Sequence, residues 1–159
     1  MARVLLIVGI FILPMACKKD LVSSFKTQRT FSTKICTVKP LVPVGLEQIY
    51  SCTNTLYALR TAFADSFRVV RNQAAFDSLL SGGCNPAVDF GQYDLLIGPR
   101  QLISGIDSVS YSLQHNCPES RYEVSVRFHG NASLMAPRVT WHLLLPKLKS
   151  GETVQVSFR

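Results

Sequence analysis

The sequence predicts an α+β domain, built mostly on an antiparallel β-sheet or an open barrel, with one short helix. Two observations predict this class. Short segments of alternating apolar and polar residues recur after Ser66, and Gly, Pro or charged turn residues separate them. One stretch, 72–80, instead has its apolar residues at the spacing of a helix. Several short strands with a single helix are typical of α+β domains.

The expected elements follow one another along the second half of the chain. A strand at 67–70 precedes the helix, for which Asn72 is the predicted N-cap and Gly82-Gly83 marks the end. Phe76 lies on the apolar face of this helix. Five more strands are expected at 93–97, 108–114, 122–128, 139–145 and 154–158.

Residues 34–64 carry no clear pattern. Pro40 and Pro43 interrupt any sheet near the start of this segment. The remainder, 46–62, fits short strands and brief helical turns equally well, and both alternatives stay open. Because 34–159 has the length of a single domain, we expect it to form one β-rich domain.

The first residues are typical of an export signal. Arg3 supplies a positive charge before an apolar run at 4–15, which is shorter than the roughly 20 residues of a membrane-spanning helix. Ala16-Cys17 at the end of this run resembles the lipobox of bacterial lipoproteins. In that family the signal is cut before the cysteine, whose thiol receives a diacylglycerol and whose new amino group is acylated with a fatty acid such as palmitate. The alternative is an ordinary signal peptide with an incidental cysteine.

The lipobox resemblance implies an organisation of the N-terminal part and a location. Residues 1–16 would be the signal peptide, and 17–33 the lipidated N-terminus with a polar linker. Cys17 would be the site of lipid attachment. The protein is then expected in the bacterial cell envelope, anchored through Cys17 in the outer membrane.

Positive charge is concentrated near this expected anchor. The formal net charge is +7, and 18–71 holds nine Lys or Arg residues against three acidic ones. A basic segment beside a lipid anchor can contact anionic headgroups, at about 1 kcal/mol per charge. A solvated tether without a specific role is the alternative. No nucleic-acid-binding module accompanies the charge, so no nucleic-acid partner is expected.

If the protein is exported, the other four cysteines are expected to form disulfides. Cys36, Cys52, Cys84 and Cys117 would lie in an oxidising compartment, where disulfides persist. Of the three possible pairings, we expect Cys84 with Cys117, since both lie in loops able to meet at one end of a sheet. Cys36 and Cys52 flank a proline-containing bend and form the second expected pair. Metal binding is the rival interpretation, but the chain has no C-x-x-C pair and no zinc-ligand spacing. No metal and no cofactor are therefore expected.

The second half of the chain also resembles a known family. The residues that carry the resemblance are 76–80 in the expected helix, Cys84, Asp89-Phe90, the strand at 93–97, Leu145-Pro146-Lys147 and Val154-Gln155-Val156. They resemble the domain of the PrcB family, named for a subunit of a secreted protease complex, over 67–159. The resemblance implies protein binding or stabilisation of a protease without catalysis, and it offers no catalytic residues to transfer.

Motifs of several common catalytic sites are absent from the sequence. It contains no G-x-S-x-G elbow, no G-x-x-x-x-G-K-[ST] phosphate loop and no H-E-x-x-H zinc helix. Asp89 is interpreted as a turn residue whose carboxylate accepts backbone N–H bonds. His115, His129 and His142 are interpreted as surface or strand-packing residues. The alternative is that Asp89 is a catalytic acid, which requires a partner carboxylate or histidine. Trp141, the only tryptophan, is expected in the core.

These observations predict a membrane-anchored envelope lipoprotein whose domain binds another envelope or secreted protein without catalysing a reaction. In this hypothesis the domain stabilises a protease or another surface complex. The alternative function is an envelope hydrolase that uses Asp89 or a histidine.

Overall fold

The computed structural model describes residues 37–64 and 66–159. The chain divides into two units, Met1–Lys34 and Ile35–Arg159, and the described residues belong to the second. Among them, no helix is both long and apolar enough to cross a bilayer.

Three N-terminal predictions lie outside the described residues. They are the signal peptide at 1–16, the linker at 17–33 and the lipid attachment at Cys17. The described residues all fall in the region predicted to form the β-rich domain.

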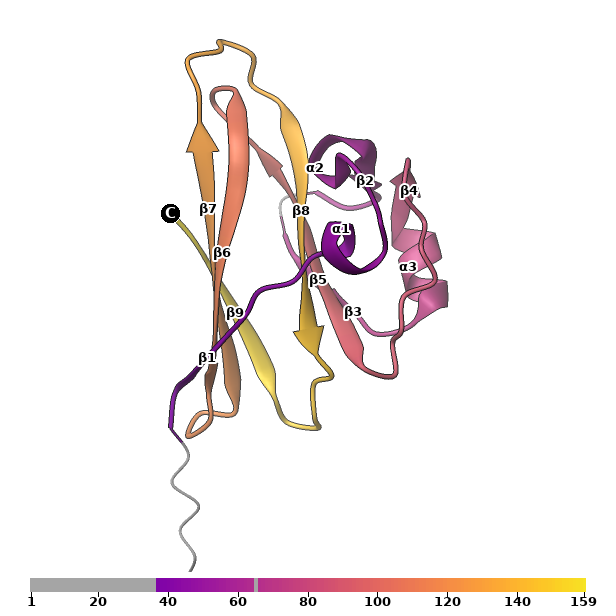
Figure 1. The fold of residues 1–159 in the computed structure, drawn as a ribbon, viewed down its shortest axis with the longest axis vertical. Helices are drawn as coiled ribbons and strands as arrows, with labels where there is room; N and C mark the ends of the chain where they lie inside the picture. The colour runs from indigo at the N-terminus through magenta and orange to yellow at the C-terminus, as the bar shows by residue number, and fades with distance from the viewer. Residues whose placement is uncertain (1–36, 65) are drawn as a thin grey trace, which may run out of the picture. The chain divides into compact units, whose positions relative to one another are not determined.

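Two β-sheets pack against each other in this domain (Figure 1). The larger sheet has the strand order β1 (Lys39–Leu41), β6 (Ile106–Asn116), β7 (Arg121–Gly130) and β9 (Thr153–Phe158). The smaller sheet has the order β3 (Arg68–Val70), β5 (Tyr93–Gln101) and β8 (Arg138–Pro146). Neighbouring strands are antiparallel except β7 and β9, which run parallel. The described residues thus form mixed and antiparallel sheets, with no closed barrel, in a broadly α+β fold.

Three short helices and a two-stranded ribbon lie beside the smaller sheet, on the side away from the larger one (Figure 1). The helices are α1 (Leu46–Ile49), α2 (Thr55–Ala58) and α3 (Gln73–Leu79), and the ribbon pairs β2 (Leu59–Thr61) with β4 (Leu80–Gly82). The prediction of a single helix is wrong. The two additional helices have four residues each and fall in the segment where the sequence left strands and helical turns open.

The three layers enclose two apolar cores, one on each face of the smaller sheet. The core between the two sheets contains Leu96, Leu113, Tyr122, Val124, Val126, Trp141, Leu143, Leu145 and Leu148. The core between the smaller sheet and the helices contains Leu46, Cys52, Leu59, Val70, Phe76, Val88, Leu95, Ile97 and Leu144. Both cores take residues from β5 and β8, which explains why these strands read as unbroken apolar runs instead of alternating ones. Trp141 is buried, as predicted.

The helix that the sequence predicts is α3, and its N-cap is confirmed. The side-chain oxygen of Asn72 accepts the N–H of Ala75 at 2.8 Å. Phe76 is buried against the smaller sheet. The helix ends at Leu79, before the predicted stop at Gly82-Gly83, because residues Leu80–Gly82 leave it to pair with β2.

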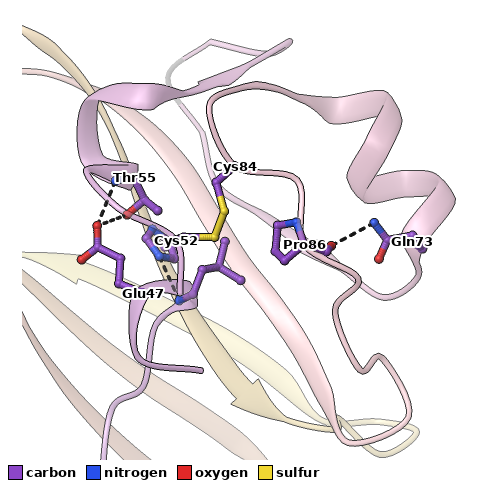
Figure 2. The surroundings of a disulfide bond; sticks show 8 residues. Glu47, Cys52, Thr55, Gln73, Cys84 and Pro86 are labelled. Carbon is purple, nitrogen blue, oxygen red and sulfur yellow. Dashed lines mark hydrogen bonds between the residues drawn. A yellow bond between two sulfur atoms is a disulfide. The ribbon is translucent and has the colours of Figure 1, made fainter. Parts of the chain in front are cut away.

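The predicted disulfide pairs are wrong. A disulfide joins Cys52 to Cys84, whose Cα atoms are 5.7 Å apart, so neither Cys84–Cys117 nor Cys36–Cys52 forms (Figure 2). The sequence predicts that the segment before Cys52 folds back as a hairpin. In the structure, α1 and the turn after it instead place Cys52 beside the loop that follows β4. Cys117 is also disulfide-bonded, and its partner lies outside the described residues.

Candidate functional site

The residues considered for catalysis lie on different elements. Asp89 lies in the turn before β5, His115 near the end of β6, His129 near the end of β7 and His142 in the middle of β8. Within residues 37–64 and 66–159, no hydrogen bond or ion pair links Asp89 to a histidine. The hydrogen bonds and ion pairs of the described residues therefore do not bring Asp89 together with a histidine.

Asp89 makes the turn contacts that the sequence predicts. Its Oδ1 accepts the N–H of Gly91 at 3.0 Å, and its backbone carbonyl accepts the N–H of Tyr93 at 3.0 Å. Its own N–H donates to the hydroxyl of Tyr50 at 2.8 Å. Asp89 thereby directs the chain into β5, and its role in the fold is that of a turn residue.

Two of the histidines make contacts typical of neighbouring strands. Nε2 of His129 lies 2.8 Å from Oγ of Ser110 on β6. The ring of His115 stacks on Tyr122 with 4.4 Å between the ring centroids, and its Nε2 lies 3.3 Å from a carboxylate oxygen of Glu152. Both histidines fit the predicted surface and strand-packing roles.

His142 is buried and caps a helix from another element. Its Nε2 accepts the N–H of Leu46, the first residue of α1, at 3.1 Å. This N–H has no partner within the helix, and β8 supplies its acceptor. Burial lowers the pKa of His142 to about 4, although the negative charge of Glu47 opposes that shift. The imidazole is therefore neutral at pH 7, and its Nε2 carries the lone pair that holds α1.

Glu47 caps the second helix in the same way. Its Oε1 accepts both the N–H of Thr55 at 2.9 Å and the Thr55 hydroxyl at 2.7 Å, at the first residue of α2 (Figure 2). The N-cap residue Asn54 makes no side-chain capping bond of its own. Partial burial raises the pKa of Glu47, but the two bonds from Thr55 outweigh it, and the pKa lies below its ordinary value. The carboxylate is thus ionised where it faces the positive end of a helix.

A cleft of about 470 Å³ lies beside these capping groups, between the α1–α2 segment, β8 and β6. The hydroxyl of Tyr111 lines it and accepts the backbone N–H of His142 at 3.3 Å. Burial raises the pKa of Tyr111 to about 12; the bond from His142 opposes this rise and the charge of Glu47 adds to it. Nε2 of His142 and Oε1 of Glu47 are both engaged at helix starts. Through these bonds, His142 of β8 holds the start of α1, and Glu47 of α1 holds the start of α2.

No group of three or more His, Cys, Asp or Glu side chains in the described part of the chain could hold a metal ion.

A second hollow lies on the other side of the sandwich, and we call it the edge groove. It has a volume of about 410 Å³ and is lined by Ser66, Phe67, Pro99, Arg100, Gln101 and Phe158. It adjoins a smaller hollow that shares Arg100, Gln101 and Phe158 and extends to Leu102, Ile103, Phe128 and Arg159. The edge groove therefore lies where the end of β5 approaches the end of β9.

Phe158 is the central aromatic residue of the edge groove. Its ring packs edge-on against the buried Trp141, with centroids 5.6 Å apart, and stacks on Phe128 at 6.2 Å. The guanidinium of Arg100 lies 4.6 Å from the centre of the same ring. Phe158 nevertheless remains 39% exposed, and Ile103 is 97% exposed. Aromatic and arginine side chains held in fixed positions and open to solvent are typical of the residues that dominate protein interfaces.

Comparison of the chain with family models, with curated proteins and with solved structures finds no match.

Apart from His142 in the first cleft, the sequence did not point to the residues that build the two hollows. Glu47 and Thr55 fall in the segment without a clear pattern. Phe158 was expected in the last strand, at 154–158, but alternation along a strand does not show which strand lies beside it. The sequence predicts Trp141 in the core, where it lies, and the exposed aromatic residue is its neighbour Phe158.

Proposed function

We propose that this protein is a lipid-anchored protein of the bacterial envelope whose domain binds another envelope or secreted protein, without catalysis, through the edge groove. The observation that carries this proposal is the exposed group formed by Phe158 and Arg100 in the edge groove together with Ile103 in the adjoining hollow. Its aromatic ring is held by Trp141 and Phe128, so little side-chain freedom is lost when a partner covers it.

Two features of the sequence support the rest of the proposal. Ala16-Cys17 resembles a lipobox, which would place the domain on the outer membrane through a lipid on Cys17. The resemblance of 67–159 to the PrcB domain favours a role in binding or stabilising a protease or another surface complex. Neither feature calls for a cofactor, a metal or a catalytic residue.

Site-directed photo-cross-linking tests the binding surface. A photoreactive amino acid in place of Ile103, in the full-length protein expressed in whole cells, is expected to give discrete adducts of higher mass. The matched control is the same substitution at Tyr57, which is 44% exposed and lines the cleft on the opposite side. Equal adduct patterns at the two positions, or none at Ile103, would contradict the proposed surface.

Cys17→Ser tests the anchor separately. Several acyl chains hold a protein stably on a membrane, so loss of the attachment residue is expected to release or mislocalise the protein. The measurement is detergent phase partitioning together with mass spectrometry of the N-terminal peptide. Wild-type protein that is soluble in the periplasm and carries no lipid on Cys17 would refute the anchor.

A further inference from the structure

The outer edge of β9 differs from the other free edges of the two sheets. β9 is six residues long, and its sequence Thr-Val-Gln-Val-Ser-Phe contains no proline and no charge. No strand in the described part of the chain pairs with its outer side. Such an edge presents a row of unpaired backbone groups to a passing chain.

The remaining edges of the two sheets carry features that discourage pairing. The opposite edge of the larger sheet, β1, has three residues and includes Lys39 and Pro40. In the smaller sheet, β3 has three residues and begins with Arg68. The free side of β8 is already used, because its Leu144 N–H donates to the carbonyl of Val44 at 2.7 Å. Short strands, proline and charge are common means of protecting an edge, and β9 has none of them.

The direction of the backbone groups along β9 follows from its bonds to β7. The N–H of Thr153 donates to the carbonyl of Ser120, and the N–H of Arg159 donates to that of Val126. Since successive residues of a strand point their N–H groups to opposite sides, the even-numbered residues between them direct theirs away from β7. These residues are Val154, Val156 and Phe158.

The charge around the edge groove selects the partner. Arg100 and Arg159 line the two adjoining hollows, and no acidic side chain of the described residues lines either one. A second copy of the same chain would carry the same formal net charge of +7, which opposes association of two copies. An acidic segment of another protein satisfies both arginines.

We propose that the partner adds an extended strand to the outer edge of β9. This strand places a large apolar side chain over Phe158 in the edge groove and an acidic side chain against Arg100 or Arg159. Backbone hydrogen bonds to Val154, Val156 and Phe158 supply affinity that does not depend on sequence, and the groove and arginines supply specificity. The inference rests on the proposed protein-binding function and specifies its mode and its partner chemistry.

A displayed library of random eight-residue peptides, selected on the purified full-length protein in detergent micelles, provides the probe. The enriched peptides are expected to combine strand-forming residues with an Asp or Glu near a large apolar residue. One enriched peptide is then synthesised, and its binding is measured by calorimetry. Arg100→Glu with Arg159→Glu is expected to weaken binding at least tenfold. The matched control, Arg60→Glu with Lys149→Glu, makes the same charge change at exposed positions that do not line the groove and is expected to change binding less than threefold.

N-methylation of the peptide tests strand addition itself. Two versions are made, with methyl groups on the odd or on the even backbone nitrogens. In an added strand only one set of N–H groups faces β9, so one version is expected to lose binding and the other to retain it. Hydrogen exchange is expected to show that the amides of Val154, Val156 and Phe158 exchange freely in the unbound protein and become protected by the unmethylated peptide.

The outcomes separate this inference from the function on which it rests. Strand addition at β9 would be overturned if the two methylated versions bound equally well or if the peptide protected another edge. It would also be overturned if the β9 amides were already protected without peptide. Enrichment of basic peptides, or of none, would overturn it as well. The cross-linking at Ile103 is independent of these results. Adducts at Ile103 together with a negative peptide result would retain the protein-binding surface and reject this mode of binding.

Discussion

The ammonium group of Lys147 lies 2.6 Å from Oδ1 of Asp94, whose side chain is completely buried. The other carboxylate oxygen of Asp94 accepts the N–H of Leu148 at 3.1 Å, and the guanidinium of Arg71 approaches it at 3.8 Å. One buried carboxylate at the start of β5 thus fixes the turn that leaves β8. The chain must make this turn before it can enter the larger sheet as β9.

We expect Asp94→Ala to lower the free energy of unfolding by about 2–4 kcal/mol. The substitution removes a charge-assisted hydrogen bond and leaves the buried N–H of Leu148 without its acceptor. Urea denaturation measures the change. Asp77→Ala on the exposed side of α3 is the matched control, for which a change within about 0.5 kcal/mol is expected. Equal effects of the two substitutions would contradict the pinning role of Asp94.

The disulfide prediction concerns the covalent link between the α1–α2 segment and the loop after β4. Non-reducing peptide mapping is expected to recover Cys52 joined to Cys84. Replacing both by Ser is expected to cost about 3–4 kcal/mol of unfolding free energy, on the chain-entropy model for a loop of this length. The loop after Cys84 is also held by Gln73, whose amide donates to the carbonyl of Pro86 at 3.2 Å (Figure 2). Recovery of a peptide joining Cys84 to Cys117 would contradict the structure.

The partner of Cys117 tests the lipid anchor independently. Cys117 is disulfide-bonded, and Cys52 and Cys84 use each other, so the partner within one chain is Cys17 or Cys36. A thiol that carries a diacylglycerol cannot form a disulfide. We therefore expect mass spectrometry to find Cys117 joined to Cys36 and Cys17 modified by lipid. A peptide joining Cys17 to Cys117 would exclude the anchor.

The buried His142 makes the domain less stable in acid. Burial holds its pKa at about 4 in the folded protein, against an ordinary value of 6.5 that applies when the chain is unfolded. The unfolded chain therefore binds a proton first as the pH falls. The stabilisation from the neutral imidazole is complete above pH 6.5 and is lost between pH 6.5 and pH 4, by up to roughly 3 kcal/mol.

The measurement compares urea denaturation at pH 7 and pH 4.5 for the wild type and for His142→Gln. An amide oxygen can still accept the N–H of Leu46, but it does not titrate in this range. We expect a smaller pH dependence in the variant, and an NMR titration in which the wild-type ring shows no protonation above pH 5. A ring that titrates near pH 6.5 in the folded protein would contradict the buried capping role.

Features that depend on neighbouring residues in the sequence could be predicted, whereas contacts between residues far apart in the sequence could not. Asn72 and Phe76 show their roles within a few residues of sequence, because capping and helical spacing are local properties. The alternation of β6 and β7 likewise identified two long strands. His142 accepts the N–H of a residue 96 positions earlier, and no local signal reports such a bond. The parallel pairing of β9 with β7 also depends on the order of strands in space.

The cysteine pairing shows the same difference. The proline-containing bend before Cys52 predicts a hairpin that would bring Cys36 close to Cys52. The formation of α1, with only four residues, depends on an acceptor from β8 more than on helix propensity. Because that acceptor lies in a strand near the other end of the chain, the position of Cys52 followed from the tertiary structure.

Trp141 packs edge-on against Phe158, on which the edge groove is centred, and it is the only tryptophan in the chain. Its indole is closely confined, since a Cβ added at Gly98 would lie 2.8 Å from Cζ2 of the ring. A molecule that covers Phe158 is expected to change the surroundings of the only indole in the chain. The protein thus contains a built-in optical reporter at the groove, readable without labels and unobscured by other indoles.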